Sequence, residues 1–457
     1  MLCKATQLNE IPNAFIPGPL PLPELREFYF DKTMPVRMGD PIDDPIDDIF
    51  LACTTPPTLD HPTYQPILLV GNRGCGKSTE LNFLSNRLKD NGAHVHTVAC
   101  RYDLENAPEF ADLLILIADA FVTIADEVGY KPEASAERTL NDFWTEQEDT
   151  TTMQTATSAK FGAGVSGNVS GSTETETTLL PAPKTAKLSL KAILKSFINL
   201  RAEYGVSEDC RQVYRKRVKR HLSEWMSAIN SIADGLTQKL GGKPPVIIFE
   251  ELDKLHSPGV WQVFYQDGFR LTGFHFPVIY TFPSAFAVDS HYPALRDDFK
   301  CVRFYMIPVT KANGEPDDSG IAAILEIMKL RADMSLFGEG VPELLIEKTG
   351  GSLRDLFSTI RDSFQRARRR NAARIEKEDA EWALKRAQNE FKYEIDANQY
   401  KFLRKMHTDR KYREQIDDRK LTVDLLDKRI LLEHNGWQSV HPLVVDFLTE
   451  QGVLTNG

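Results

Sequence analysis

The sequence lacks an uninterrupted apolar run of about 18 residues and lacks a signal-peptide pattern, so it offers no candidate membrane span and no export signal. Its six cysteines are scattered, with no CxxC pair and no metal-ligand spacing, which favours reduced thiols over disulfides or a zinc site. A net charge of -10 excludes an overall basic excess, so any DNA contact must be regional. We therefore expect a cytoplasmic protein with no membrane partner.

The chain is long enough, at 457 residues, for two or three domains. Short apolar runs alternate with helical patterns over much of its length, and helical patterns alone occupy the stretch from Gly320 to about residue 391. This order predicts an α/β fold with a central parallel sheet, then a helical lid and a winged-helix-like module. The expected parts are an N-terminal arm packing on the core (1–64), the core with an insertion at about 130–190 (65–310), the lid (311–395) and the C-terminal module (396–457).

The strongest motif is at residues 65–81, where a short apolar run, a glycine-rich turn and a helix start follow one another. From Gly71 to Ser78 the spacing is G-x-x-x-x-G-K-S, the P-loop pattern, in which backbone N–H groups cradle phosphates. Lys77 would reach the β- and γ-phosphates of ATP, and Ser78 would ligate Mg²⁺. The residues expected to contact the nucleotide are Gly71, Asn72, Arg73, Gly74, Cys75, Gly76, Lys77, Ser78 and Thr79. The alternative is a chance glycine turn.

A second diagnostic stretch is KPPVIIFEELDKL, in which the apolar run 246–249 ends in two glutamates. A buried parallel strand delivers acidic side chains to the sheet edge where a nucleotide lies, as in a Walker B motif. Glu250 would hydrogen-bond water on Mg²⁺ or act as metal ligand. Glu251 would be the general base that orients the attacking water, and Asp253 is a substitute for either role.

Two more residues are candidates for the chemistry, each with a structural alternative. Thr281 ends the apolar run 276–281 and would touch the γ-phosphate or the water, unless it only caps a strand. Arg354 follows Gly350 and Gly351, which would let its helix approach closely, and it would close on the phosphates from the lid. A solvated helix face is the alternative for Arg354.

Several other segments carry open interpretations. The proline-rich arm would lie across the base, with Arg37 or Asp40 lining it, or would simply pack on the core. Arg296 and Arg303 are candidates for an arginine finger, with surface salt bridges as the alternative. The Ser-, Thr- and Gly-rich insertion is either a projecting β-hairpin or a disordered segment. The clustered arginines of the lid would meet nucleic acid or acidic protein, or lie on a solvated helix: Arg366, Arg368, Arg369 and Arg370.

The C-terminal stretch 400–457 predicts a helix, a short strand near residues 430–432, a turn at Asn435 and Gly436, and a return through Trp437. This order is typical of the wing of a winged-helix module, which serves DNA or protein equally.

Together these motifs resemble AAA+ and STAND P-loop ATPases, near the branch of the origin-recognition initiators, and more narrowly a group of bacterial ATP-binding proteins. The resemblance covers roughly residues 28–391, and Glu250 departs from it by replacing the usual Asp. It implies that Lys77, Ser78, Glu250, Glu251, Thr281 and Arg354 hold the roles given above. It also implies work in signalling, DNA transactions or antiphage defence, often beside a separately encoded effector.

The sequence supports two functional hypotheses of different classes. The first is an ATP-dependent molecular switch that self-associates when ATP is bound, hydrolyses ATP slowly with Mg²⁺, and controls assembly with a partner. The second is an ATP-dependent DNA-binding initiator-like or DNA-loading protein. A small-molecule kinase shares the P-loop, but such kinases seldom carry so large a helical tail and a consecutive glutamate pair.

Overall fold

A computed structural model describes residues 2–30, 33–38, 44–58, 62–100, 108–145, 215–216, 218–255, 257–409, 412 and 418–454. Its centre is a five-stranded parallel sheet in the order β2-β3-β4-β1-β5. The strands are β1 (Ile67–Gly71), β2 (Val95–Ala99), β3 (Val246–Glu250), β4 (Val278–Pro283) and β5 (Lys300–Phe304). The three inner strands are almost entirely buried, as expected for a parallel sheet covered on both faces.

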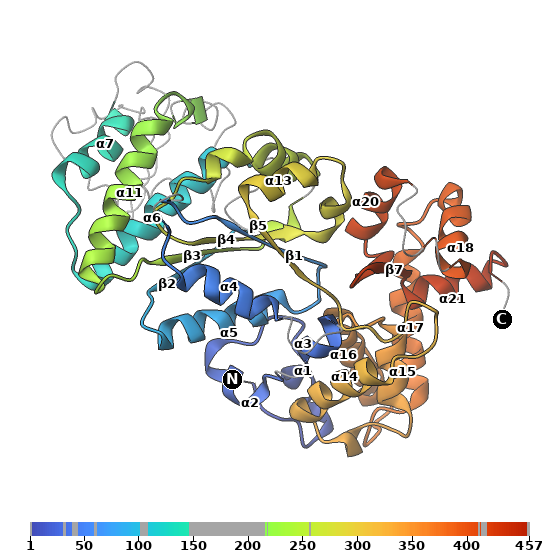
Figure 1. Cartoon of the computed structure of the whole chain (residues 1–457). Coiled ribbons are helices and arrows are strands. Elements are labelled where there is room, and N and C mark those ends of the chain that lie inside the picture. The colour runs from blue at the N-terminus through green and yellow to red at the C-terminus, as the bar shows by residue number, and fades with distance from the viewer. Residues whose placement is uncertain are drawn as a thin grey trace, which may run out of the picture.

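Successive side chains of β1 point to opposite faces of the sheet. Both faces are therefore apolar, and helices cover each of them. Leu68 and Val70 belong to one hydrophobic cluster, and Ile67 and Leu69 to the other. Helices α4 and α5 lie on one side in Figure 1, and α6, α11 and α13 on the other. These helices are α4 (Pro45–Thr54), α5 (Lys77–Asp90), α6 (Phe110–Val128), α11 (Leu222–Lys239) and α13 (Tyr292–Asp298).

All five strands run the same way, so their carboxyl ends meet at one edge. The strand that precedes the glycine-rich turn, β1, is separated from the acidic strand β3 by β4. The predicted phosphate loop and the two glutamates therefore emerge at the same edge, with the end of β4 between them. Ligands of open α/β sheets bind at this edge.

The lid is a helical bundle that packs beside the core (Figure 1). Two of its helices are linked by Arg370, whose Nε and Nη2 donate to the buried carboxylate of Asp379 at 2.9 and 2.6 Å. The helices are α14 (Asp318–Arg331), α15 (Val341–Lys348), α16 (Leu353–Arg369) and α17 (Lys377–Phe391). Arg366 also pairs with Asp379, at 3.7 Å, so part of the predicted arginine cluster is occupied within the lid.

The N-terminal arm contacts both core and lid. Its helices are α1 (Ile11–Ala14), α2 (Leu25–Phe28) and α3 (Thr33–Met38). On the core side, Tyr29 stacks on Phe83 of α5 with ring centroids 4.5 Å apart. On the lid side, the N–H of Ala5 donates to the carbonyl of Arg331, whose guanidinium donates to the carbonyl of Ala14 at 3.0 Å. The arm thus contacts both the core and the lid, which the sequence predicts to be separate parts.

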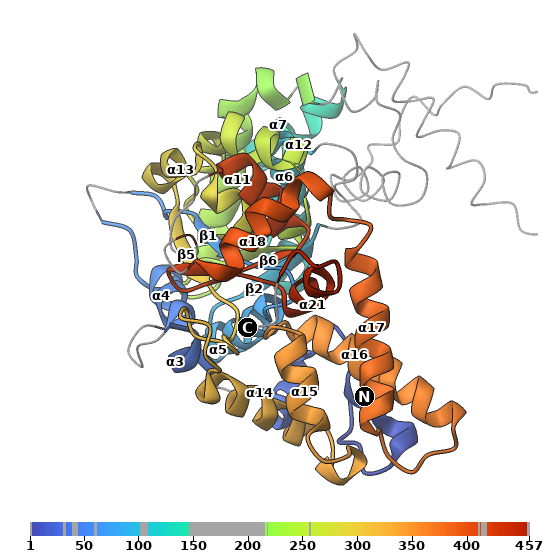
Figure 2. The ribbon, with the colours of Figure 1, turned by 90° about the vertical axis from the view of Figure 1, so that its right-hand side faces the viewer.

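The described residues of the C-terminal module form a two-stranded antiparallel hairpin with helices around it, and Figure 2 shows the module in front of the sheet, near β1 and β5. The elements are α18 (Tyr400–Thr408), α20 (Arg419–Asp427), β6 (Leu431–His434), β7 (Trp437–Val440) and α21 (Pro442–Glu450). Gly436 turns the hairpin with a φ of +81°, which a glycine adopts without strain. The predicted strand, turn and returning strand are all present.

The predicted fold class is confirmed as a P-loop NTPase fold with a central parallel sheet, a helical lid and a winged-helix-like module. The predicted insertion begins with helix α7 (Ala134–Thr145). Its remainder, including the segment interpreted as hairpin or disorder, lies outside the described residues, as does Asp40. None of the helices in the described ranges is long and apolar enough to cross a membrane.

Candidate nucleotide-binding site

The glycines of the phosphate loop are required by contact and by backbone conformation. A Cβ at Gly71 would lie 2.5 Å from the carbonyl oxygen of Phe304 in the neighbouring strand β5, so no side chain fits there. Gly74 and Gly76 have φ values of +88° and +104°, which glycine adopts most easily. Helix α5 begins directly after Gly76, at Lys77. The loop therefore has the tight turn and following helix of a phosphate cradle.

Lys77 is buried and engaged by groups of its own chain. Its Nζ donates to the carbonyls of Gly71 and Asn72 at 2.7 and 2.8 Å. It also forms an ion pair with Asp253 at 2.8 Å. Burial opposes ionisation of Asp253, but the charge of Lys77 and its hydrogen bond outweigh burial and lower the pKa of this carboxyl. The sequence offered Asp253 only as a substitute, and here it is the acidic partner of the lysine.

Ser78 and Glu250 meet across the site, where the hydroxyl of Ser78 faces the carboxylate that ends β3 and favours its charged form. Burial, then the charges of Asp253 and Glu251, raise the pKa of Glu250 to about 7. One oxygen of Glu250, Oε1, is buried and has no hydrogen-bond partner in the described part of the chain. A hydroxyl beside a carboxylate with a spare oxygen fits Mg²⁺, which takes one or two protein ligands beside phosphates.

Glu251 lies just beyond the strand with a φ of +70°. Its carboxylate pairs with Lys254, and its side chain is 20% exposed. A non-glycine residue in this conformation is uncommon and often occurs at functional sites. Glu251 thus faces a cation three residues on, and its role as general base stays a prediction.

Thr281 does not end its strand, as the sequence suggested, because β4 continues through parallel pairing of Pro283 with Gly71. Its buried hydroxyl donates to the carbonyl of Phe249 at 3.2 Å and accepts the N–H of Asp253 at 3.4 Å. Thr281 therefore joins β3, β4 and the loop that carries Asp253. A contact of Thr281 with phosphate stays a prediction.

Ser284 is the polar residue that follows β4, and the sequence reading missed it. Its hydroxyl donates to the side-chain Oδ1 of Asn72 in the phosphate loop. The signal was present, since a serine directly after the proline of FPSAF is the first polar side chain beyond the strand.

The lid reaches the phosphate loop through the first turn of α16. A Cβ at Gly74 would lie 3.0 Å from Ser352 Oγ and 3.1 Å from Arg354 Cβ. Arg354 is half-buried and forms no ion pair with any described residue. Its position beside the loop suits the predicted contact with phosphates, which stays a prediction. Arg303, a finger candidate, instead pairs with Glu433 of β6 in its own chain.

The arm supplies contacts on the other side of the loop. Arg37 is buried, with its guanidinium 4.5 Å from the ring centre of Phe304 and Nη1 donating to the carbonyl of Tyr305 at 2.6 Å. Burial lowers its pKa, and its Nε has no partner among described residues. Thr79 accepts the N–H of Leu20 at 3.1 Å, so this predicted nucleotide contact also anchors the arm.

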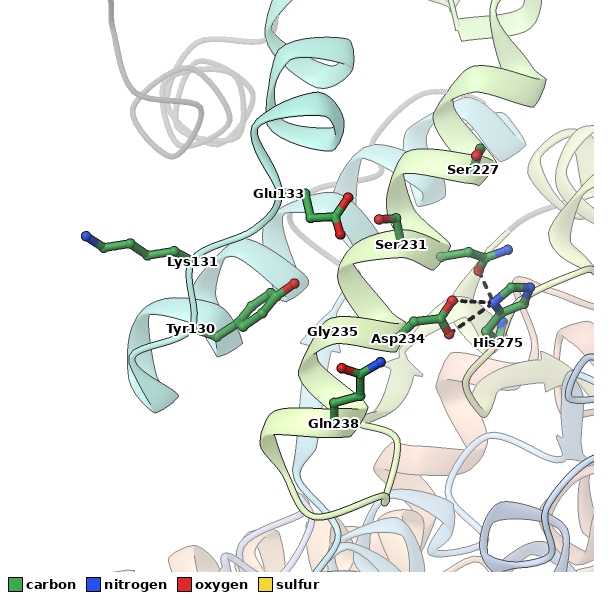
Figure 3. Close-up of a pocket in the computed structure, with 10 residues that line it drawn as sticks. Tyr130, Lys131, Glu133, Ser227, Ser231, Asp234, Gly235, Gln238 and His275 are labelled. Atoms are coloured by element: carbon green, nitrogen blue, oxygen red, sulfur yellow. Dashed lines mark hydrogen bonds and ion pairs between the residues drawn. The ribbon is translucent and has the colours of Figure 1, made fainter.

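A separate groove of about 740 Å³ lies between helix α11 and the segment that leads into α7 (Figure 3). His275 and Asp234 form a pair at 3.0 Å on one wall, and Tyr130 stands over Gly235. His275 precedes β4, so the groove is at the amino ends of the strands. It does not belong to the candidate nucleotide site, which lies at their carboxyl ends.

No protein-family model matches the chain. No curated protein matches it. Among solved structures, the ADP form of the ORC2 protein of Aeropyrum pernix matches with 11% identity over 97% of this chain and 98% of that chain, with a TM-score of 0.40. CDC6P from Pyrobaculum aerophilum matches with 13% identity over 96% of this chain and 97% of that chain, with a TM-score of 0.35. The ORC1 protein of A. pernix in complex with DNA matches with 13% identity over 92% of this chain and 97% of that chain, with a TM-score of 0.34.

Proposed function

We propose that the protein is an Mg²⁺-dependent ATPase that acts as a nucleotide-controlled switch. The observation that carries this proposal is the meeting of two distant segments at one sheet edge. The hydroxyl of Ser78 in the phosphate loop faces the carboxylate of Glu250, and Lys77 lies 2.8 Å from Asp253. This hydroxyl, this ammonium group and these two carboxylates are the groups that bind a triphosphate and its metal ion.

In this proposal Lys77 leaves Asp253 to bind the β- and γ-phosphates, while backbone N–H groups of residues 71–79 hold the remaining oxygens. Ser78 and Glu250 would hold Mg²⁺, which when bound neutralises charge that develops on the phosphates. Glu251 would orient the attacking water after it separates from Lys254. Thr281 and Arg354 would complete the site from β4 and from the lid.

The test uses two variants with opposite expectations. Lys77→Ala should abolish ATP binding, because it removes the ammonium group that would bind the β- and γ-phosphates. Lys89→Ala, at the exposed far end of α5, is the matched control and should bind as the parent does. Binding is measured by isothermal titration calorimetry, and retained affinity in Lys77→Ala would contradict the site.

Hydrolysis is tested separately with Glu251→Gln. This variant should bind ATP but release phosphate at least about 10²-fold more slowly than the parent, because a positioned base contributes at least this much to the rate. Phosphate release at the parent's rate would assign the base elsewhere, with Asp253 as the next candidate. A phosphorylated acceptor in place of free phosphate would indicate a kinase.

DNA binding is the second candidate function, and one observation favours it over a separate effector protein. Helix α18 exposes Lys401, Arg404 and Lys405, which share one helix face in a module with a wing-like hairpin. Basic residues on such a face meet phosphates. Affinity for duplex DNA should then fall steeply with salt, and a Lys401, Arg404 and Lys405 triple alanine variant should flatten that dependence. A flat salt series in the parent would remove this function.

A further inference from the structure

Asn72 and Arg73, the two residues after Gly71 in the phosphate loop, both contact other parts of the fold. The guanidinium of Arg73 donates through Nε to the carbonyl of Asp253 at 3.2 Å. Its Nη2 forms an ion pair at 3.2 Å with Asp427, the last residue of α20. Arg73 therefore joins the phosphate loop, the acidic loop after β3 and the C-terminal module.

Asn72 is linked to the same module by a second route. Its Oδ1 accepts from Ser284, whose hydroxyl also faces the buried carboxylate of Glu433 of β6 and favours its charged form, and that carboxylate pairs with Arg303 of β5. A hydroxyl has one proton to donate. Since that proton goes to Asn72, Ser284 lies between the phosphate loop and the hairpin, with its hydroxyl bound to the loop side.

The C-terminal hairpin is packed tightly enough to hold these groups in place. Leu432 lies in the hydrophobic cluster that contains Cys75 of the phosphate loop. A Cβ at Gly350 would lie 2.5 Å from Leu432, so the hairpin and the lid touch. The side chain of Asn435, at the hairpin turn, donates to the carbonyl of Met38 in the arm at 2.6 Å. The hairpin thus contacts core, lid and arm at once.

We propose that Asp427 and Glu433 of the C-terminal module position the phosphate loop through Arg73 and Asn72, so that nucleotide affinity depends on docking of that module. This inference rests on the nucleotide site proposed above. The coupling is reciprocal, because a module that stabilises the binding form of the loop is itself stabilised when nucleotide binds.

The first test is a double-mutant cycle on the full chain, with ADP carrying a fluorescent ribose substituent as probe. Asp427→Asn and Arg73→Gln should each weaken binding about 5- to 20-fold, the range of a moderate coupling. The double variant should be no weaker than the weaker single variant, because both changes break one contact. Multiplying effects, or no effect of Asp427→Asn, would overturn the linkage.

Asp424→Asn is the matched control for charge. Asp424 lies one turn earlier in α20 and pairs with Lys428 rather than with the loop. It should change affinity less than 2-fold, which is within the scatter expected of a surface site. An effect as large as that of Asp427→Asn would reduce the linkage to a general charge effect and overturn it.

The second linkage is tested by Ser284→Ala, which removes the connecting hydroxyl without leaving Arg303 unpaired. Nucleotide affinity should fall, and Glu433→Gln should reproduce the fall where it folds. Nucleotide should also slow amide hydrogen exchange in β6 and β7 of the parent, but not of Ser284→Ala. Equal protection in both proteins would contradict the coupling.

The outcomes separate this inference from the proposed function. If the parent binds nucleotide and Lys77→Ala does not, the site stands, and unchanged affinities in Asp427→Asn and Ser284→Ala overturn the linkage alone. If the parent binds no nucleotide, the proposed function fails and the linkage fails with it.

Discussion

Single glycines decide how closely the lid approaches the core. Gly350 and Gly351 have φ values of +62° and +84°. A Cβ at Gly351 would lie 1.9 Å from the carbonyl oxygen of Ile307, which is backbone and cannot rotate away. The prediction that these glycines allow a close approach agrees with this geometry, because a side chain at either position would separate the lid from its neighbours.

Gly351→Ala should lower the free energy of unfolding by more than about 2 kcal/mol, since it combines a strained backbone with a clash. Gly340→Ala is the matched control. Its φ of +71° is similar, but the space around a new Cβ is open. It should lose only about 1 kcal/mol, from the left-handed conformation. Urea unfolding followed by circular dichroism measures both, and equal losses would mean that the contact with Ile307 does not matter.

Two buried histidines make the C-terminal elements sensitive to acid. Burial lowers the pKa of His434 in β6 to about 3 and that of His441 before α21 to about 4. His441 Nδ1 accepts the N–H of Leu443 at 3.2 Å, which requires the neutral ring. In the unfolded chain a histidine titrates near pH 6.5. The module therefore has its full stability above about pH 6.5 and loses it as the pH falls toward 4.

At pH 5, the neutral state of buried His441 should lower the free energy of unfolding by about 2 kcal/mol, because this histidine binds a proton in the unfolded chain but not in the native module. His441→Asn retains a side-chain acceptor for the helix N-terminus and does not titrate. It should match the parent at pH 8 within the effect of repacking, and should lose less stability between pH 8 and pH 5. Hydrogen exchange of α21 at both values measures this. An equal loss would place the acid sensitivity elsewhere.

At the scale of the whole molecule, arm, lid and C-terminal module all converge on the carboxyl edge of the sheet. Leu20 of the arm reaches Thr79, Ser352 of the lid lies beside Gly74, and Asp427 pairs with Arg73. A ligand at this edge would touch or displace groups from three parts of the chain. This arrangement suits a switch, because nucleotide occupancy can change how the parts dock.

Self-association is the expected response of the switch. A slowly hydrolysed ATP analogue should increase the mass of the parent measured by light scattering, whereas ADP should not. Lys77→Ala should stay at its starting mass with either nucleotide. The same mass in all samples would remove nucleotide-controlled assembly from the proposal and leave ATP hydrolysis to stand alone. Assembly with an effector and a role in antiphage defence depend on this first step.

The sequence alone determined the fold class, the phosphate loop, the acidic strand and the C-terminal hairpin, because each depends on local periodicity or on spacing within a few residues. Only the tertiary structure decided that Lys77 pairs with Asp253, that the hydroxyl of Thr281 is hydrogen-bonded between β3 and β4, and that Ser284 contacts Asn72. It also decided that Arg303 and Arg73 face the C-terminal module. These contacts join residues that are distant in the chain, and their partners are set by how loops and modules pack, which no local pattern encodes.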